Sequence, residues 1–166
     1  GIHEPFYAKL VSDAPTVSAG SAHCVALKLD GSLVCWGDDD KGQIQTPTGA
    51  GFISVHAGAG HSVAVKADGS LVSWGFDGAG QVSKTPTGPF SMVSAGHRHS
   101  VALRADGTII TWGDGAAVQD TPTGTDFVAV VAGYDHSVAL RSNGTLASWG
   151  NDKAGQIRTT PTMNCF

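Results

Sequence analysis

Hydrophobic and polar residues alternate along short stretches of this chain, and a period of two residues predicts β-strands. In the segment 99–104, apolar side chains fall on one face and small or polar side chains on the other. The segment 108–112 is rich in β-branched residues and ends in tryptophan, a composition that favours strands. Asp106-Gly107 lies between the two segments. Because glycine accepts the positive φ of a tight turn, the stretch predicts a β-hairpin.

This hairpin is one of four copies. Tryptophans recur at spacings of 38, 38 and 37 residues, and one histidine and one glycine per copy keep the same spacings. The three series are Trp36, Trp74, Trp112 and Trp149; His23, His61, His99 and His136; and Gly20, Gly58, Gly96 and Gly133. Three residue types in register exclude a chance periodicity, so the chain consists of four tandem repeats of about 38 residues.

Regular spacing of about 40 residues with a Trp-Gly pair is typical of β-propeller blades. We therefore expect an all-β fold in which each repeat forms a blade of three to four short antiparallel strands. A solenoid of stacked β-turn units is the structural alternative. The repeats are expected near 17–54, 55–92, 93–129 and 130–166, inside a propeller domain that spans 14–166. Segment 1–13 is expected to cap a blade or to swap onto a neighbouring chain.

Composition narrows the classes of partner. Charged residues make up 14% of the chain, and the formal net charge is −4. Without a basic surplus we expect no binding to nucleic acid or to an anionic membrane. No apolar run reaches the roughly 18 residues of a membrane span, and no signal peptide is visible. The cellular compartment is undecided, and we prefer a secreted, extracellular protein of the bacterial type.

The consensus AGxxHSVALxxDGxLxSWGxDxxGQ, which recurs over residues 17–162, resembles the regulator of chromosome condensation repeat family. The resemblance implies a propeller, commonly of seven blades. Members of this family include a guanine-nucleotide exchange factor for a small GTPase, a plant photoreceptor and a bacterial β-lactamase inhibitor protein. The short repeats look most like the bacterial members. Only four repeats are present, and no insertion could serve as the wedge of an exchange factor.

The recurring histidines and tryptophans are interpreted as structural. Four histidines could suggest a metal site. However, each blade has one histidine at the same strand position, so the four should be distributed around the ring and should not converge. We expect them to hydrogen-bond the backbone, and the tryptophans to pack inside or between blades. The acidic run 38–40 matches no known calcium loop. No nucleophile elbow or phosphate loop is present. We therefore predict no catalytic residue, no metal and no cofactor.

Two stretches vary from repeat to repeat within the constant scaffold: the pair before each histidine, and the loop after each Trp-Gly pair. Loops on a rigid scaffold commonly carry recognition, although these could simply be unconstrained. The residues expected to bind a partner are Asp38, Asp39, Phe76, Asp77, His97, Arg98, Tyr134 and Asp135. The sequence predicts a non-catalytic scaffold that binds a protein, or a glycan, through one propeller face. A guanine-nucleotide exchange factor-like regulator and a purely structural assembly protein are the alternatives.

The three cysteines are too few for a disulfide framework. Cys24 and Cys35 take positions that hold serine or threonine in the sister repeats. If Gly31 forms a bulge after a type I turn, the two lie on opposite faces of their hairpin, where no bridge can form. We predict three free thiols, with Cys165 as the third.

The chain does not start and stop at repeat boundaries. It enters the first repeat at Val17, and it ends at Phe166, the aromatic that elsewhere precedes the next repeat. The two ends of the chain are therefore complementary. If they do not pair, they expose a strand edge and an apolar blade face. We expect a homo-oligomer, with a two-chain ring preferred over an open filament, and a closed four-bladed monomer third.

Overall fold

The computed structural model describes residues 17–162, and it consists of four three-stranded antiparallel sheets with orders β1-β2-β3, β4-β5-β6, β7-β8-β9 and β10-β11-β12. Their bounds are β1 Val17–Ala19, β2 His23–Leu27, β3 Leu33–Gly37, β4 Phe52–Ala57, β5 His61–Lys66, β6 Leu71–Gly75, β7 Phe90–Ala95, β8 His99–Arg104, β9 Ile109–Gly113, β10 Phe127–Ala132, β11 His136–Arg141 and β12 Leu146–Gly150. The all-β prediction is confirmed, with three strands in each blade.

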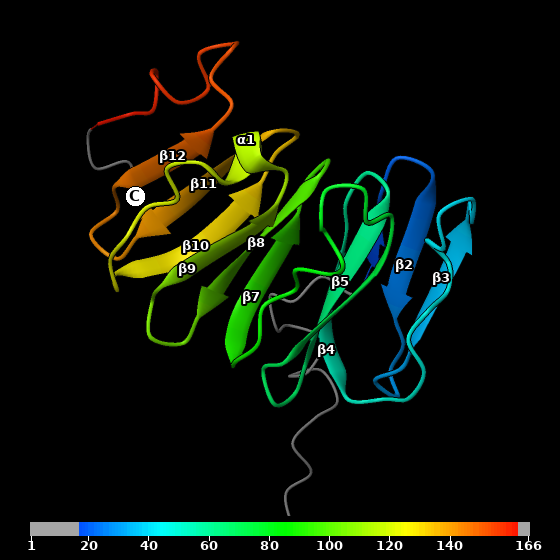
Figure 1. Cartoon of the computed structure of the whole chain (residues 1–166). Helices are drawn as coiled ribbons and strands as arrows, with labels where there is room; N and C mark the ends of the chain where they lie inside the picture. Colours follow the sequence, from blue (N-terminus) through cyan, green and yellow to red (C-terminus); the bar gives the residue numbers. More distant parts are fainter. Residues whose placement is uncertain (1–16, 163–166) are drawn as a thin grey trace, which may run out of the picture.

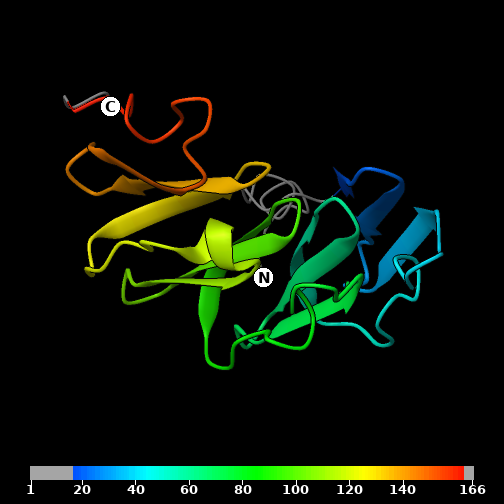
Figure 2. The same ribbon diagram turned by 45° about the horizontal axis from the view of Figure 1, so that its top comes forward.

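The four sheets, which we call blades 1 to 4, stand side by side in chain order (Figures 1 and 2). Blade 1, in blue to cyan, and blade 4, in yellow to orange, lie at opposite ends of the row (Figure 1). One short helix, α1 (Gly115–Val118), interrupts the all-β pattern and contacts β12. The sequence did not predict it, because four residues are too few for a helical period to show.

The predicted hairpin forms between β8 and β9, where Leu103 pairs with Ile109. Gly107 adopts φ +81°, a conformation in which a side chain would be strained. The Asp106 carboxylate accepts hydrogen bonds from the Thr108 hydroxyl at 2.7 Å and from the Thr108 backbone N–H at 2.9 Å. These bonds lower the pKa of Asp106. The Asp-Gly pair that predicted the turn therefore also stabilises it.

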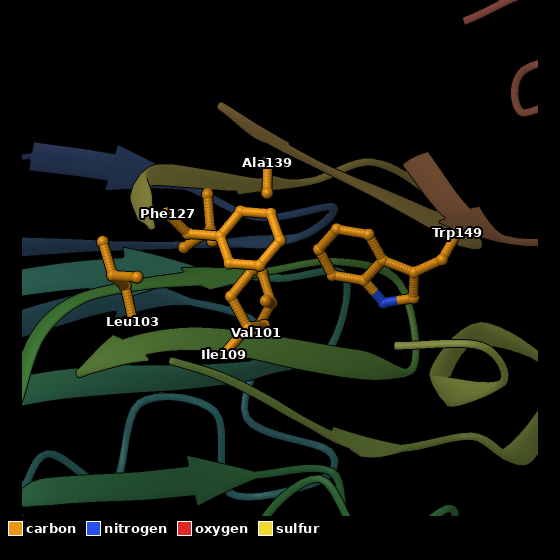
Figure 3. Packing of buried hydrophobic residues seen from close by; sticks show 7 residues of the cluster. Val101, Leu103, Ile109, Phe127, Ala139 and Trp149 are labelled. Atoms are coloured by element: carbon orange, nitrogen blue, oxygen red, sulfur yellow. The ribbon is translucent and has the colours of Figure 1, made fainter. Parts of the chain in front are cut away.

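The hydrophobic core lies between the blades. Val63 and Val65 of blade 2 cluster with Ala102 and Trp112 of blade 3. In the next cluster, Phe127, Ala139 and Trp149 of blade 4 face Val101, Leu103 and Ile109 of blade 3 (Figure 3). Because every cluster draws on two blades, each blade is stabilised by its neighbours.

The prediction that all four tryptophans are packed is wrong for Trp36. Trp74, Trp112 and Trp149 are at most 6% exposed, whereas Trp36 is 49% exposed. In the described part of the chain no blade precedes blade 1, so the face that the other blades bury is open here. Val17 lies on this face and is also exposed. Phe166 and segment 1–13 lie outside the described residues, so the expectations for them stay predictions.

The described residues contain no helix that is both long and apolar enough to cross a membrane.

The pairing of β2 with β3 confirms the predicted placement of the cysteines. Val25 pairs with Cys35, and Cys24 pairs with Trp36, so the two side chains lie on opposite faces of the hairpin. Both thiols are free, and burial raises the pKa of Cys35. Thiol titration of the denatured, unreduced chain should count three groups, whereas a count of one would show that a bridge forms.

Candidate binding rim

The two variable stretches of every repeat meet at one end of its blade. In blade 2, His61 at the start of β5 pairs with Gly75 at the end of β6. The loops that flank these residues are therefore adjacent, and Phe76 N–H donates to the Gly60 carbonyl at 2.8 Å. Equivalent bonds join the two stretches in the other repeats: Asp38 to Ala22, Asp114 to Arg98 and Asn151 to Asp135. We call this edge the rim; it comprises residues 21–22, 59–60, 97–98 and 134–135 with 38–41, 76–79, 114–117 and 151–154.

Next to the rim, equivalent loops from all four repeats line a shallow hollow of about 280 Å³. Its lining consists mostly of small residues and backbone: Ala19, Gly20, Ser21, Ala57, Gly58, Ala59, Ala95, Gly96, His97, Ala132, Gly133 and Tyr134. Only three of these twelve residues have polar side chains. The hollow can therefore accept bulk but offers few side-chain hydrogen-bond partners.

Backbone contacts between blades hold the wall of this hollow in place. A Cβ atom added to Gly96 would lie 2.5 Å from the Gly133 carbonyl oxygen, closer than any real side chain approaches, so glycine is required here. His97 N–H donates to the Tyr134 carbonyl at 3.0 Å, and Ala59 N–H donates to the Gly96 carbonyl at 3.1 Å. The hollow is thus a rigid feature of the fold.

The structure brings four of the predicted binding residues together on blades 3 and 4. The rings of His97 and Tyr134 stack with centroids 4.0 Å apart and an angle of 15°. The Tyr134 hydroxyl lies 3.2 Å from His97 Nε2, and His97 Nδ1 lies 3.7 Å from the Asp135 carboxylate. Arg98 faces Asp114 at 3.8 Å. Tyr134 is 64% exposed, so a pre-ordered aromatic and charged cluster borders the hollow.

The other predicted binding residues lie elsewhere along the rim. Phe76 is half-buried and packs close to Gly60: a Cβ atom added to Gly60 would lie 3.2 Å from the Cβ atom of Phe76. Asp38 accepts a hydrogen bond from the Gln43 side chain at 3.0 Å. Asp39 accepts one from the Ile44 backbone N–H at 3.1 Å. These groups are tied to their own loops, and their role in binding stays a prediction.

Asp77 has the same local task in blade 2. Its carboxylate accepts hydrogen bonds from the backbone N–H groups of Ser83 at 2.9 Å and Val82 at 2.8 Å. These bonds lower the pKa of Asp77. Within residues 17–162, no group of three His, Cys, Asp or Glu side chains could hold a metal ion.

Three of the four repeated histidines lie between blades, and the expectation that they bond the backbone is wrong for these three. The Nε2 atom of each shares a hydrogen bond with a serine hydroxyl of the next blade: His23 with Ser62 at 2.8 Å, His61 with Ser100 at 2.8 Å, and His99 with Ser137 at 2.9 Å. Burial lowers the pKa of both His61 and His99 to about 4. They are therefore neutral structural groups at neutral pH.

Sequence reasoning missed the role of a recurring glutamine. The carbonyl of Gln43 accepts a hydrogen bond from Trp74 Nε1, and the carbonyl of Gln81 accepts one from Trp112 Nε1, both at 2.9 Å. The signal was the Gly-Gln pair that three repeats share, which we interpreted only as a turn. Repeat 3 has α1 at this place, and the buried Nε1 of Trp149 has no hydrogen-bond partner.

This difference gives a matched pair of variants. Trp112→Phe removes a buried hydrogen bond together with part of a ring, whereas Trp149→Phe removes only part of a ring. We expect the first change to lower the free energy of unfolding by about 1 kcal/mol more than the second, as measured by urea denaturation. Equal losses would contradict a stabilising role for the bond to Gln81.

Comparisons with known proteins agree with this architecture. The regulator of chromosome condensation (RCC1) repeat model matches residues 16–43, 52–81, 93–116 and 127–156, more than half of the chain. No curated protein gave a significant match.

Among solved structures, the receptor kinase CR4 ectodomain of Physcomitrella patens is 29% identical, with a TM-score of 0.70 over 81% of this chain and 40% of its own. The ACR4 ectodomain of Arabidopsis thaliana is 25% identical, with a TM-score of 0.68 over 83% and 51%. Prp20p of Saccharomyces cerevisiae is 22% identical, with a TM-score of 0.67 over 84% and 46%; this likeness shows the fold alone.

The chain thus spans between 40% and 51% of the length of these structures. They come from plants and yeast, so the expected likeness to bacterial members stays a prediction. The repeat match, the four sheets and the inter-blade cores together lead to one conclusion: the chain belongs to the regulator of chromosome condensation (RCC1) repeat family.

Proposed function

We propose that this chain is a non-catalytic scaffold that binds a protein partner through the rim of blades 3 and 4. The observation that supports this most is the stacking of His97 on Tyr134, which is 64% exposed beside the hollow. An exposed tyrosine normally loses conformational freedom when it is bound. Here stacking already restricts Tyr134, which lowers the entropic cost of association. Tyrosine and arginine, like tryptophan, are enriched among the side chains that contribute most of the binding energy of protein interfaces.

A protein fits this site better than a glycan does. Sugar hydroxyls need several side-chain hydrogen-bond partners, and the hollow is lined mainly by alanine and glycine. An apolar side chain that projects from a partner surface could fill such a hollow without leaving polar groups unpaired. Arg98, which follows His97 in the sequence, faces Asp114, and both are half-buried. These opposite charges would orient the partner.

The test replaces Arg98 and Tyr134 of this rim by alanine, together with Phe76 of the neighbouring blade 2. Because each truncation at an interface centre costs about 2 kcal/mol or more, we expect affinity for a captured partner to fall at least about 100-fold while circular dichroism stays unchanged. Asn143→Ala, at the opposite end of blade 4, is the control and should bind normally. Equal binding by the triple variant would remove the rim as the binding site, and a glycan array would then test the alternative ligand.

Nucleotide exchange is the competing activity. The solved structure of Prp20p is described together with its binding to Gsp1p and histones. This observation motivates a nucleotide-release assay with small GTPases. We expect the chain to leave the release rate unchanged; acceleration that is lost in the triple variant would replace the scaffold proposal with an exchange factor.

We also propose that the chain self-associates. The supporting observation is the exposure of apolar side chains on blades 1 and 4, with Val17 at 61%, Trp36 at 49% and Val131 at 62%. Equivalent faces of the inner blades are buried. Light scattering behind a sizing column should give a mass of at least twice 16.9 kDa.

A further inference from the structure

The contacts between consecutive blades follow a common plan. Each blade presents a forward face to the blade after it and a rear face to the blade before it. Between blades 2 and 3, the forward residue Leu71 and the rear residue Ile110 belong to one cluster. Between blades 3 and 4, Ile109 and Ala147 take these places. The same two strand positions therefore meet at successive junctions.

Two polar contacts follow the same direction. A tryptophan on the rear face donates to a glutamine carbonyl of the preceding blade, as Trp112 does to Gln81. A histidine on the forward face meets a serine hydroxyl on the rear face of the following blade, as His99 does with Ser137. The junctions of blades 1 with 2 and 2 with 3 thus combine an apolar contact, a Trp–Gln bond and a His–Ser bond, whereas the junction of blades 3 and 4 lacks the Trp–Gln bond.

Blade 1 carries the rear half of such a junction. Trp36 occupies the place of the donating tryptophan, and Val34, which is 41% exposed, occupies the place of Ile110. Cys24 stands where the later blades have the serine. Within the described residues nothing buries Trp36, which remains half exposed.

Blade 4 carries the forward half. Gln156 has the local geometry of the glutamines that receive a tryptophan: its side chain accepts from the Ala154 backbone N–H at 2.9 Å, as Gln81 accepts from Ala79 at 2.7 Å. His136 and Leu146 take the places of the histidine and of Leu71, and both are only half-buried. His136 Nδ1 has no hydrogen-bond partner, as in the inner blades.

We infer that blade 4 of one chain docks head to tail on blade 1 of a second copy. In this junction Trp36 Nε1 donates to the Gln156 carbonyl, His136 Nε2 meets the Cys24 thiol, and Val34 packs on Leu146. The inference rests on the proposed self-association and names the surfaces that carry it. A second copy is the occupant because this chain itself supplies both halves of the junction in the right register.

The chemistry of the two faces supports this occupant. The rear-face positions of blade 1 hold Val, Ala, Cys, Val and Trp (residues 17, 26, 24, 34 and 36), and the forward-face positions of blade 4 hold Val, His, Leu and Leu (residues 131, 136, 140 and 146). Neither set includes a lysine, arginine, aspartate or glutamate. Lys28 takes the place of Arg104 at the end of the rear face and is exposed. Bringing the listed positions together therefore buries no unpaired permanent charge, a cost that weakens association.

The test places opposite charges on the two halves. Val34→Glu and Leu146→Lys should each reduce the mass from at least twice 16.9 kDa to that of one chain, because every homotypic junction then buries a lone charge. An equimolar mixture of the two variants should recover a two-chain mass. In the mixture one junction is unmodified, and the other pairs glutamate with lysine. Recovery on mixing also shows that both variants fold.

Two further variants serve as controls. Cys24→Ser installs the residue that the three later blades use, so assembly should persist. Ile53→Glu places the same charge at an equally exposed apolar position of blade 2, since Ile53 is 45% exposed, and it should leave the mass unchanged.

A wild-type mass of 16.9 kDa would overturn both this inference and the proposed self-association. Partner binding at the rim is measured separately and does not depend on this result. A wild-type oligomer whose mass survives Val34→Glu and Leu146→Lys would overturn only the assignment of the faces. Single-chain variants whose mixture stays at 16.9 kDa would overturn the pairing.

Discussion

The free energy of unfolding of this chain is expected to fall by on the order of 6 kcal/mol as the pH is lowered from 6.5 to 4. His61 and His99 cause most of the loss, because burial between blades lowers their pKa values from 6.5 to about 4. In this pH range the unfolded chain binds a proton at each histidine and the native chain does not. Stability is therefore complete above about pH 6.5 and is lost progressively on acidification, by about 3 kcal/mol for each group.

Urea denaturation at pH 7, 5.5 and 4.5 measures this dependence. His99→Gln is expected to be less stable than the wild type at pH 7, because the pairing with Ser137 is disturbed. Its stability should also change less with pH, because one of the two histidines whose pKa is lowered to about 4 is gone. A wild-type free energy that is the same at pH 7 and pH 4.5 would contradict the burial of these histidines.

Trp112→Ala is expected to lower the free energy of unfolding by about 3–5 kcal/mol. Trp112 is 5% exposed, and its ring fills the space between blades 2 and 3 together with Val63, Val65 and Phe90. Its removal leaves a cavity in a core that holds two blades together, and it also leaves the Gln81 carbonyl without its donor.

Trp36→Ala is the matched control, since it makes the same change at the equivalent strand position of blade 1. Because Trp36 is 49% exposed, we expect a loss of about 1 kcal/mol or less in the single chain. Urea denaturation at a protein concentration that keeps the chain dissociated compares the two variants. Similar losses would show that Trp36 is packed in solution and that the face of blade 1 is covered.

The blades could be predicted because their signals are local. Asp106-Gly107 marks its own turn, and the alternation in 99–104 marks its own strand, so spacing alone located four hairpins. The exposure of Trp36 could not be predicted in this way. Its burial depends on a preceding blade. The repeat motif is the same in blades 2 to 4, which follow another blade, and in blade 1, which follows none within the described residues.

The site was predicted in outline only. An antiparallel hairpin places the residues before its first strand beside those after its second, so a common edge for both variable stretches was expected. The stacking of His97 on Tyr134 joins two repeats and depends on how the blades are set against each other. The serine partners of the histidines and the carbonyl of Gln81 lie in neighbouring blades for the same reason. The local hydrogen bonds of Asp39 and Asp77 within their loops were not predicted, and the role of these residues in binding stays a prediction.

The claim that the rim of blades 3 and 4 binds a protein is tested most directly by a photo-crosslinking residue placed at position 134. The matched position is 143, which is exposed at the opposite end of the same blade. Irradiation in an extract of the source cells should link position 134, and not position 143, to a protein other than the chain itself. Excess unlabelled wild-type chain should abolish the link, and excess triple-alanine variant should not. Crosslinks that are equal at both positions, or that occur at 143 alone, would contradict binding at the rim.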